Sequence, residues 1–142
     1  MVTFQPAQAQ RWDIYAGFAM ALNSADARDE LRAWCGLGLV ALAIAGIFAL
    51  LIALSRMPGI EALPIVPLGF FEKGLVVHVI FSFIVWYLSI LGCLTTVAAY
   101  RIGGGNPPGK ALVWAAIICG YAASIMLFLP GLTDSGEPLL NN

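Results

Sequence analysis

Residues 74–100 read GLVVHVIFSFIVWYLSILGCLTTVAAY and contain no charged side chain. Two further uncharged runs flank this one, at residues 33–55 and 111–133. Each run is long enough to cross the hydrocarbon core of a bilayer, which takes about 20 mostly apolar residues in a helix. Because backbone polar groups in lipid must be hydrogen-bonded within their own segment, each run is expected to be helical. The sequence therefore predicts an all-α integral membrane protein with three transmembrane helices, at about 33–55, 74–100 and 111–132.

The composition excludes several classes of protein. Of the 142 residues, 61% are hydrophobic and only 11% are charged, whereas ordinary globular domains carry about 25% charged residues. This excludes a soluble fold, and it excludes a disordered chain, which needs low hydrophobicity and high net charge. The net charge of −1 provides no positive field that would attract nucleic acid. The expected surroundings of this chain are the lipid bilayer and other membrane subunits.

Polar and helix-breaking residues separate the three runs. Residues 56–59 read RMPG and predict an irregular connection after the first helix. Residues 101–110 read RIGGGNPPGK and predict a tight turn between the second and third helices. Pro130 and Gly131 are expected to close the third helix, and residues 134–142 form a polar tail.

Residues 1–32 are expected to form a cytoplasmic, partly amphipathic segment ahead of a three-helix membrane domain at residues 33–142. Residues 12–22 are too few to span a bilayer. Aromatic residues recur there at every third position on one helical face: Trp12, Tyr15 and Phe18. This pattern suits a helix lying in the membrane interface, with its rings at the level of the headgroups. An irregular arm is the alternative.

The basic residues predict the orientation of the helices. They are more numerous on the N-terminal segment and the second connection (Arg11, Arg28, Arg32, Arg101 and Lys110) than on the first connection (Arg56 and Lys73). Loops rich in lysine and arginine stay on the cytoplasmic side. We therefore expect the N-terminus in the cytoplasm and the C-terminus on the outer side.

Small residues recur at every fourth position on two of the expected helices. One stripe comprises Ala41, Ala45, Ala49 and Ala53, and the other comprises Ala116, Gly120 and Ser124. Such stripes let membrane helices approach closely and are a packing signal. The alanine stripe and the line of small residues on the helix at 74–100 are expected to be buried against helices, some of them from another chain. The three cysteines, Cys35, Cys93 and Cys119, lie one in each helix and have no metal-motif spacing. They are interpreted as small packing residues rather than disulfide partners.

His78 is the one residue of these helices that points to chemistry. It is the only histidine of the chain and belongs, at 100° per residue, to a line of small or polar positions: Gly74, His78, Ser82, Val85, Ser89, Gly92 and Thr96. The opposite line is bulky and apolar: Val76, Ile80, Phe83, Tyr87, Leu91 and Leu94. His78 is therefore expected to face protein. Two interpretations stay open: a histidine that only hydrogen-bonds to a neighbouring helix, and an axial ligand of haem or another metal.

The depth of His78 bears on the second interpretation. It lies roughly 6–8 Å inside the outer face of the membrane at a rise of 1.5 Å per residue. Arg56 and Lys73 are expected at that face, where they would pair with the propionates of a haem bound to His78. Ser82, one turn further along, is a candidate hydrogen-bond partner of the imidazole, although it can instead bond a carbonyl of its own helix.

The residues around His78 resemble the region from helix I to helix II of haem–copper oxidase subunit I, most closely the bacterial B-type, or b(o/a)-type, branch. The resemblance is carried by SRMPG at residues 55–59, FF at 70–71, LVVHV at 75–79, FS at 81–82 and VWYL at 85–88. The tail GEPLLNN at residues 136–142 resembles the segment that follows helix III in that family. In the family the helix II histidine is an axial ligand of the low-spin haem, so the resemblance implies this role for His78. It also implies a bacterial inner membrane, with the C-terminus periplasmic.

The chain also departs from the family. It matches only the first three helices, and the second axial histidine and the histidines that hold the copper and the high-spin haem have no counterpart in it. Ile80 stands where a polar or acidic residue often follows the ligand. Because a single histidine cannot build a binuclear centre, this chain alone is not expected to reduce oxygen.

Three interpretations follow from these departures. In the first, the chain is the N-terminal piece of a split cytochrome oxidase and shares a low-spin haem with a partner chain. In the second, it is a haem-free accessory subunit of a respiratory or photosynthetic complex. In the third, two copies of the chain each give one histidine to a shared haem.

Overall fold

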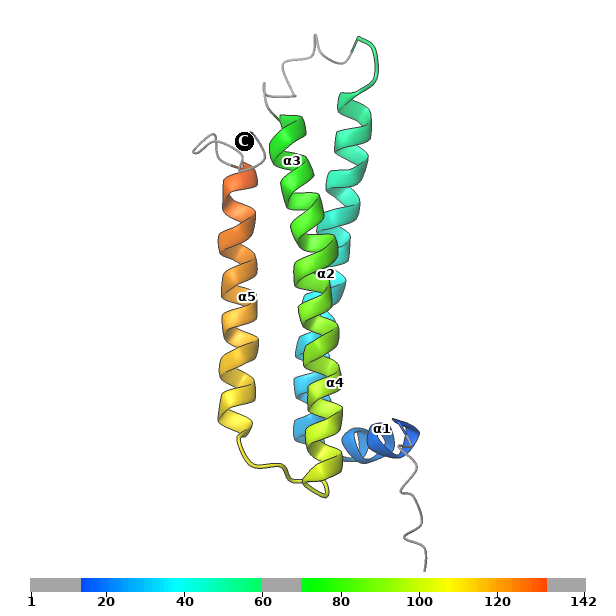
Figure 1. Cartoon of the computed structure of the whole chain (residues 1–142), viewed down its shortest axis with the longest axis vertical. Helices are drawn as coiled ribbons and strands as arrows, with labels where there is room; N and C mark the ends of the chain where they lie inside the picture. The colour runs from blue at the N-terminus through cyan, green and yellow to red at the C-terminus, as the bar shows by residue number, and fades with distance from the viewer. Residues whose placement is uncertain (1–13, 60–69, 133–142) are drawn as a thin grey trace, which may run out of the picture.

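The computed structural model describes residues 14–59 and 70–132, and every regular element in these ranges is a helix (Figure 1). Helix α1 (Ile14–Asn23) is short, and α2 (Ala25–Ser55) is long. Helix α3 (Phe70–Val79), the π-helix η2 (Ile80–Val85) and α4 (Trp86–Ile102) follow one another without a break. Helix α5 (Lys110–Leu132) is the last.

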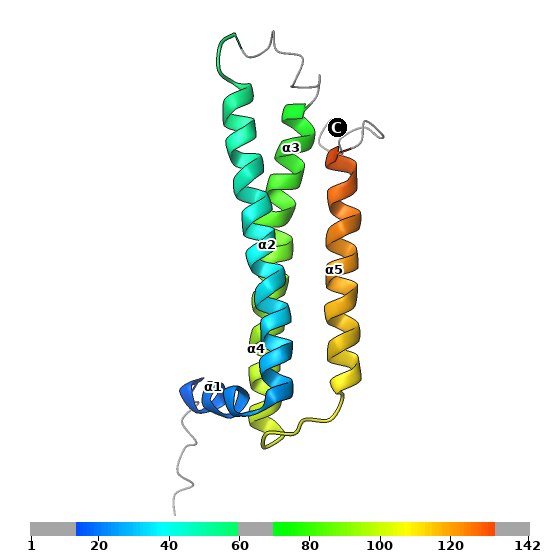
Figure 2. The ribbon, with the colours of Figure 1, turned by 180° about the vertical axis from the view of Figure 1, so that it is seen from behind.

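Three of these helical stretches are long and apolar enough to cross a membrane: Ala25–Ser55, Lys73–Ile102 and Lys110–Leu129. The α3–η2–α4 stretch runs antiparallel to α2 and to α5, which are parallel to each other. Helix α2 and the α3–η2–α4 stretch lie side by side, and α5 stands next to them (Figure 1 and Figure 2). This confirms the predicted all-α fold with three membrane-spanning helices. It is the architecture of a multi-pass membrane protein.

The first long helix starts earlier than the uncharged run at 33–55 indicated. Ser24 is its N-cap, and the Ser24 Oγ accepts a hydrogen bond of 3.5 Å from the amide of Ala27. Asp26 lies in the first turn, where a negative charge stabilises the helix dipole. Hydropathy therefore located the part of the helix that fits into lipid, whereas capping set where the helix begins.

Helix α1 lies across the axis of the bundle, at the same end as the connection between α4 and α5 (Figure 1). Its inner face buries Ala21 against Ala27, Val97 and Tyr100. Its outer face exposes 84% of Tyr15. Trp12, the first residue of the predicted aromatic face, lies outside the described residues, and the location of this helix in the membrane interface stays a prediction.

The connection between α4 and α5 brings the start of α5 to the start of α2. Gly104 and Gly105 adopt positive φ angles of 60° and 93°, which glycine accepts without steric cost. The turn leaves Lys110 in an ion pair with Asp26. Nearby, the hydroxyl of Tyr100 donates a hydrogen bond of 3.4 Å to the carboxyl of Glu30, which is 1% exposed. Polar contacts therefore join α2, α4 and α5 at this end.

Trp34 is the central packing residue of the three long helices. Its ring lies against Gly92 on α4 and against Gly120 on α5, and only 5% of the residue is exposed. The two glycines leave room for an indole between helix backbones, as small residues do at membrane helix interfaces. Leu37, one turn further along α2, also contacts Gly120.

The two stripes of small residues are buried only in part. On α2, Ala41 and Ala45 are buried, Ala49 is half-buried and Ala53 is exposed. On α5, Gly120 and Ser124 are buried, but Ala116 is exposed and Ile117 is buried in its place. Burial within this chain therefore covers Ala41 and Ala45 and leaves Ala53 and Ala116 exposed. Contact of the alanine stripe with another chain stays a prediction.

Replacing Ala45 with leucine is expected to weaken the packing of α2 against α3. Ala45 is 3% exposed, and overpacking such a site typically costs about 1–3 kcal/mol. Ala43→Leu is the matched control because Ala43 lies on the same helix and is exposed. Unfolding in mixed detergent micelles, followed by circular dichroism, measures both. Equal stability of the two variants would contradict the burial of Ala45.

Candidate functional site

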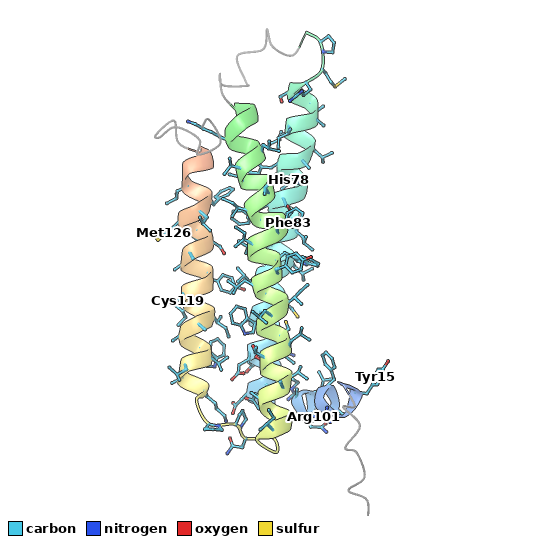
Figure 3. The ribbon with its side chains drawn as sticks, in the orientation of Figure 1. Tyr15, His78, Phe83, Arg101, Cys119 and Met126 are labelled. Atoms are coloured by element: carbon cyan, nitrogen blue, oxygen red, sulfur yellow. The ribbon has the colours of Figure 1, made fainter. Side chains whose placement is uncertain are left out.

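His78 lies in the last turn of α3, immediately before η2, on the side of the helix next to α2 (Figure 3). It is half-buried. The line of residues that it shares along α3, η2 and α4 faces protein, as expected: Gly74, Val85, Ser89, Gly92 and Thr96 are buried, and Ser82 is half-buried. On the opposite line, Phe83, Tyr87, Leu91 and Leu94 are exposed, whereas Val76 and Ile80 are half-buried.

A hydrogen bond across two helices orients the imidazole. The Nδ1 atom of His78 lies 2.8 Å from the backbone carbonyl oxygen of Ala45 on α2. A carbonyl oxygen only accepts hydrogen bonds, so the Nδ1 atom must carry the hydrogen. In a neutral imidazole this leaves the lone pair on Nε2. The side chain therefore presents a fixed ring nitrogen that can bind a metal.

Ser82 does not bond to the imidazole. Its hydroxyl donates to the backbone carbonyl of His78 at 2.6 Å, within the same helix. This is the second of the two arrangements considered for Ser82, and it falls where the α-helix changes into the π-helix. The Ser82 hydroxyl therefore provides a hydrogen bond to the backbone carbonyl oxygen of His78 itself. π-Helical segments are rare and frequently occur at functional sites.

Aromatic rings hold the helices together next to this contact. Phe48 on α2 and Phe81 on η2 both pack edge-on against Phe128 on α5, with ring centroids 6.0 Å and 5.9 Å apart. Phe48 lies one turn after Ala45, and Phe81 lies one turn after His78. The three rings therefore support the helix spacing at which the imidazole reaches the Ala45 carbonyl.

Arg56 and Lys73 stand at different heights relative to His78. His78 lies level with Ala45. The backbone of Arg56 is about 16 Å from that level, measured along the axis of α2. Lys73 begins about 8 Å from His78 along α3. Arg56 is the C-cap of α2 and Lys73 lies in the first turn of α3, so both lie at the end of the bundle where α2 ends and α3 begins; Figure 1 shows this end. Of the two cations predicted to pair with haem propionates, Lys73 is therefore nearer in level to the imidazole.

The donor set limits which groups His78 can bind. Among the described residues no three His, Cys, Asp or Glu side chains gather into a group that could hold a metal ion. A zinc site takes three or four protein ligands, which is more than the described residues bring together here. In haem proteins, side chains such as histidine supply the protein ligands of the iron. His78 is the residue of this site that could serve as such a ligand.

No protein-family model, curated protein or solved structure matches this chain. The site is therefore interpreted from its own chemistry. An apolar groove next to the three rings lies between α2, η2 and α5, with Leu37, Phe81 and Tyr121 in its lining. His78 itself does not line this groove.

Two features of the site were not predicted. Val77 and Phe81 are each 2% exposed, although neither belongs to the line of small residues drawn at 100° per residue. The buried face of this stretch changes position along the π-helix, which spans Ile80–Val85. The residue pattern did not indicate a π-helix. The acceptor for the imidazole, the Ala45 carbonyl, was also missed, because backbone atoms carry no sequence pattern; the only available indication was the alanine stripe that contains Ala45.

Proposed function

We propose that this chain supplies one axial ligand, the Nε2 atom of His78, to a low-spin haem within a larger electron-transfer complex of the bacterial inner membrane. The single observation that carries the proposal is the 2.8 Å hydrogen bond from the Nδ1 atom of His78 to the Ala45 carbonyl. Metal-binding histidines almost always donate their other ring N–H to a carbonyl or carboxylate, which fixes the tautomer and the ring orientation. The resemblance of residues 55–88 to haem–copper oxidase subunit I supports the same role.

The residues around His78 would orient and shield the group. A bound haem supplies reversible one-electron transfer. The Ala45 carbonyl holds the imidazole in the ligating tautomer. The apolar helices α2 and α3 keep water away from the ligand. Lys73 and Arg56, at the outer end of these helices, would offset the negative charge of the propionates.

The rest of the complex comes from partner subunits. The 142 residues contain one histidine, so a haem with two histidine ligands takes the second from beyond them. In this arrangement the N-terminus lies in the cytoplasm and the C-terminus in the periplasm, because four basic residues gather at the end where α1 lies: Arg28, Arg32, Arg101 and Lys110. The chain then acts as part of a terminal oxidase resembling the haem–copper enzymes.

A haem-free accessory subunit is the second candidate. The observation in its favour is that the same hydrogen bond to Ala45 already joins α2 to α3. A histidine of this kind serves packing alone and needs no iron. The two candidate functions differ in the role of the Nε2 atom of His78: it binds iron in the first, and it binds nothing in the second.

The absorption spectrum of the complex that contains this chain tests the proposal. His78→Ala is expected to remove the sharp α-band of the reduced low-spin haem. Ser89→Ala is the matched control, because Ser89 lies on the same buried face and its hydroxyl bonds only within its own helix, to the carbonyl of Val85. A spectrum that is unchanged in His78→Ala would favour the accessory subunit.

A further inference from the structure

Two of the three thiols of the chain lie in contact. The Sγ atom of Cys35 on α2 is 3.6 Å from the Sγ atom of Cys93 on α4. The two residues are far apart in the sequence, and they come together only because α2 and α4 pack side by side. Cys119 lies on α5, where it is exposed. Of the three thiols, only Cys35 and Cys93 form a sulfur–sulfur contact.

The packing of the neighbouring residues sets this contact. Cys35 directly follows Trp34, and Cys93 directly follows Gly92. A Cβ atom at Gly92 would lie 2.2 Å from the ring of Trp34, so the two backbones are in register and close at this level. One turn away, Gly38 on α2 approaches the side chain of Ser89 on α4, at 3.2 Å from a built Cβ. The approach of the two thiols therefore follows from rigid helix packing.

The two thiols differ in accessibility. Cys35 is exposed and Cys93 is half-buried. Cys35 lies about 3 Å inside the uncharged run that begins at Ala33, at the level where lipid meets water. Within this chain Cys35 and Cys119 are exposed, whereas Cys93 packs against the core of the bundle. An accessible thiol beside a second, shielded thiol is the arrangement found at sites of reversible oxidation.

We propose that Cys35 and Cys93 form a peroxide-sensitive dithiol that closes into a disulfide between α2 and α4. The Cys35 thiol loses its proton to interfacial water, and its sulfur attacks one oxygen of the peroxide. The O–O bond breaks, the other oxygen leaves as water or an alcohol after protonation, and Cys35 becomes a sulfenic acid. The Cys93 sulfur then gives up its proton and attacks the Cys35 sulfur, and the S–O bond breaks to release water. Two thiols are oxidised and one peroxide is reduced.

A disulfide suits this position better than a metal ion does. Among the described residues no third ligand joins the pair, whereas the disulfide is neutral and needs none. It would join the first two membrane-spanning helices covalently, at the end of the bundle near α1. The position of His78 plays no part in this inference, so either proposal can fail alone.

The test treats the reduced full-length chain, in lipid vesicles, with hydrogen peroxide or with cumene hydroperoxide. Remaining thiols are blocked with N-ethylmaleimide and counted by mass spectrometry. The wild-type chain is expected to lose two thiols together, and peptide mapping is expected to place the bond between Cys35 and Cys93. Faster closure with cumene hydroperoxide would assign a lipid peroxide as the oxidant, and faster closure with hydrogen peroxide would assign a water-borne one.

Three serine variants make the result decisive. C119S is expected to close as the wild type does, whereas C35S and C93S are expected to form no bond within the chain. Trypsin cleavage after Arg56 gives a second readout, since the oxidised fragments should migrate together until a reductant is added. Circular dichroism checks that the variants keep their helices. The proposal is overturned if the wild-type chain forms no internal disulfide, or if the bond involves Cys119 or a second chain.

Discussion

His78→Leu is expected to abolish the low-spin haem absorption while leaving the amount of chain in the membrane unchanged. Leucine offers no ligand to iron, and it is favourable within a membrane helix. His78→Met is expected to keep part of the absorption at a raised reduction potential, because the methionine thioether is an accepted axial ligand. Redox difference spectra of membranes, with the chain quantified by immunoblot, measure both effects.

The comparison of leucine with methionine isolates ligation from packing. Both side chains are apolar, and both lose the hydrogen bond that His78 makes to the carbonyl of Ala45. They differ in the sulfur atom that can reach iron. If His78 serves packing alone, the two variants should behave alike and no haem absorption should depend on this position. Absorption of wild-type strength in His78→Leu would contradict ligation directly.

Gly92→Ala is expected to produce the largest loss of stability of any single methyl added to the long helices. A Cβ atom at Gly92 would lie 2.2 Å from Cδ2 and 2.4 Å from Cε2 of the Trp34 ring, far inside van der Waals contact. The other edge of the ring faces Gly120 on α5, where a built Cβ would lie 3.6 Å away, so a ring displaced toward α5 approaches its backbone. Overpacking of this kind typically costs about 1–3 kcal/mol.

Gly46→Ala is the matched control for this clash. It adds the same methyl group to a helix interior, but no atom lies within 4 Å of the built Cβ. Alanine has a higher helix propensity than glycine, by roughly 1 kcal/mol, so this variant is expected to be neutral or slightly stabilised. Unfolding in mixed micelles, followed by tryptophan fluorescence and circular dichroism, compares the two. A smaller loss in Gly92→Ala than in Gly46→Ala would show that α2 and α4 do not pack as described.

The number and type of membrane helices were predictable from the sequence. The solvent decides both: in hydrocarbon a backbone must satisfy its own hydrogen bonds, so a long uncharged run has only one local structure available. The break between the second and third membrane helices was also predictable, because residues 103–109 contain the glycines and prolines that are typical of a turn. Lys110–Leu132, the last helix, therefore matches the prediction of 111–132 closely.

The position of His78 on a protein-facing side was also determined by the sequence, because helical periodicity groups it with small residues. What its ring nitrogens contact was decided only by the tertiary structure. The partner of Nδ1 is the backbone carbonyl of Ala45, and every residue has such a carbonyl. Which carbonyl lies opposite the imidazole depends on how far α3 is shifted along α2, and the sequence of either helix alone leaves that shift open.

For the cysteines too, some properties follow from the sequence and others from the tertiary structure. Their number and their distribution, one to each helix, are properties of the sequence. The contact between Cys35 and Cys93 exists because Trp34 fits against Gly92, which sets the register of α2 on α4 and leaves Cys119 apart. Local sequence determined which segments become membrane helices, since lipid acts on each segment separately. The tertiary structure alone decided which atoms of different helices meet, since side-chain packing between helices sets their register.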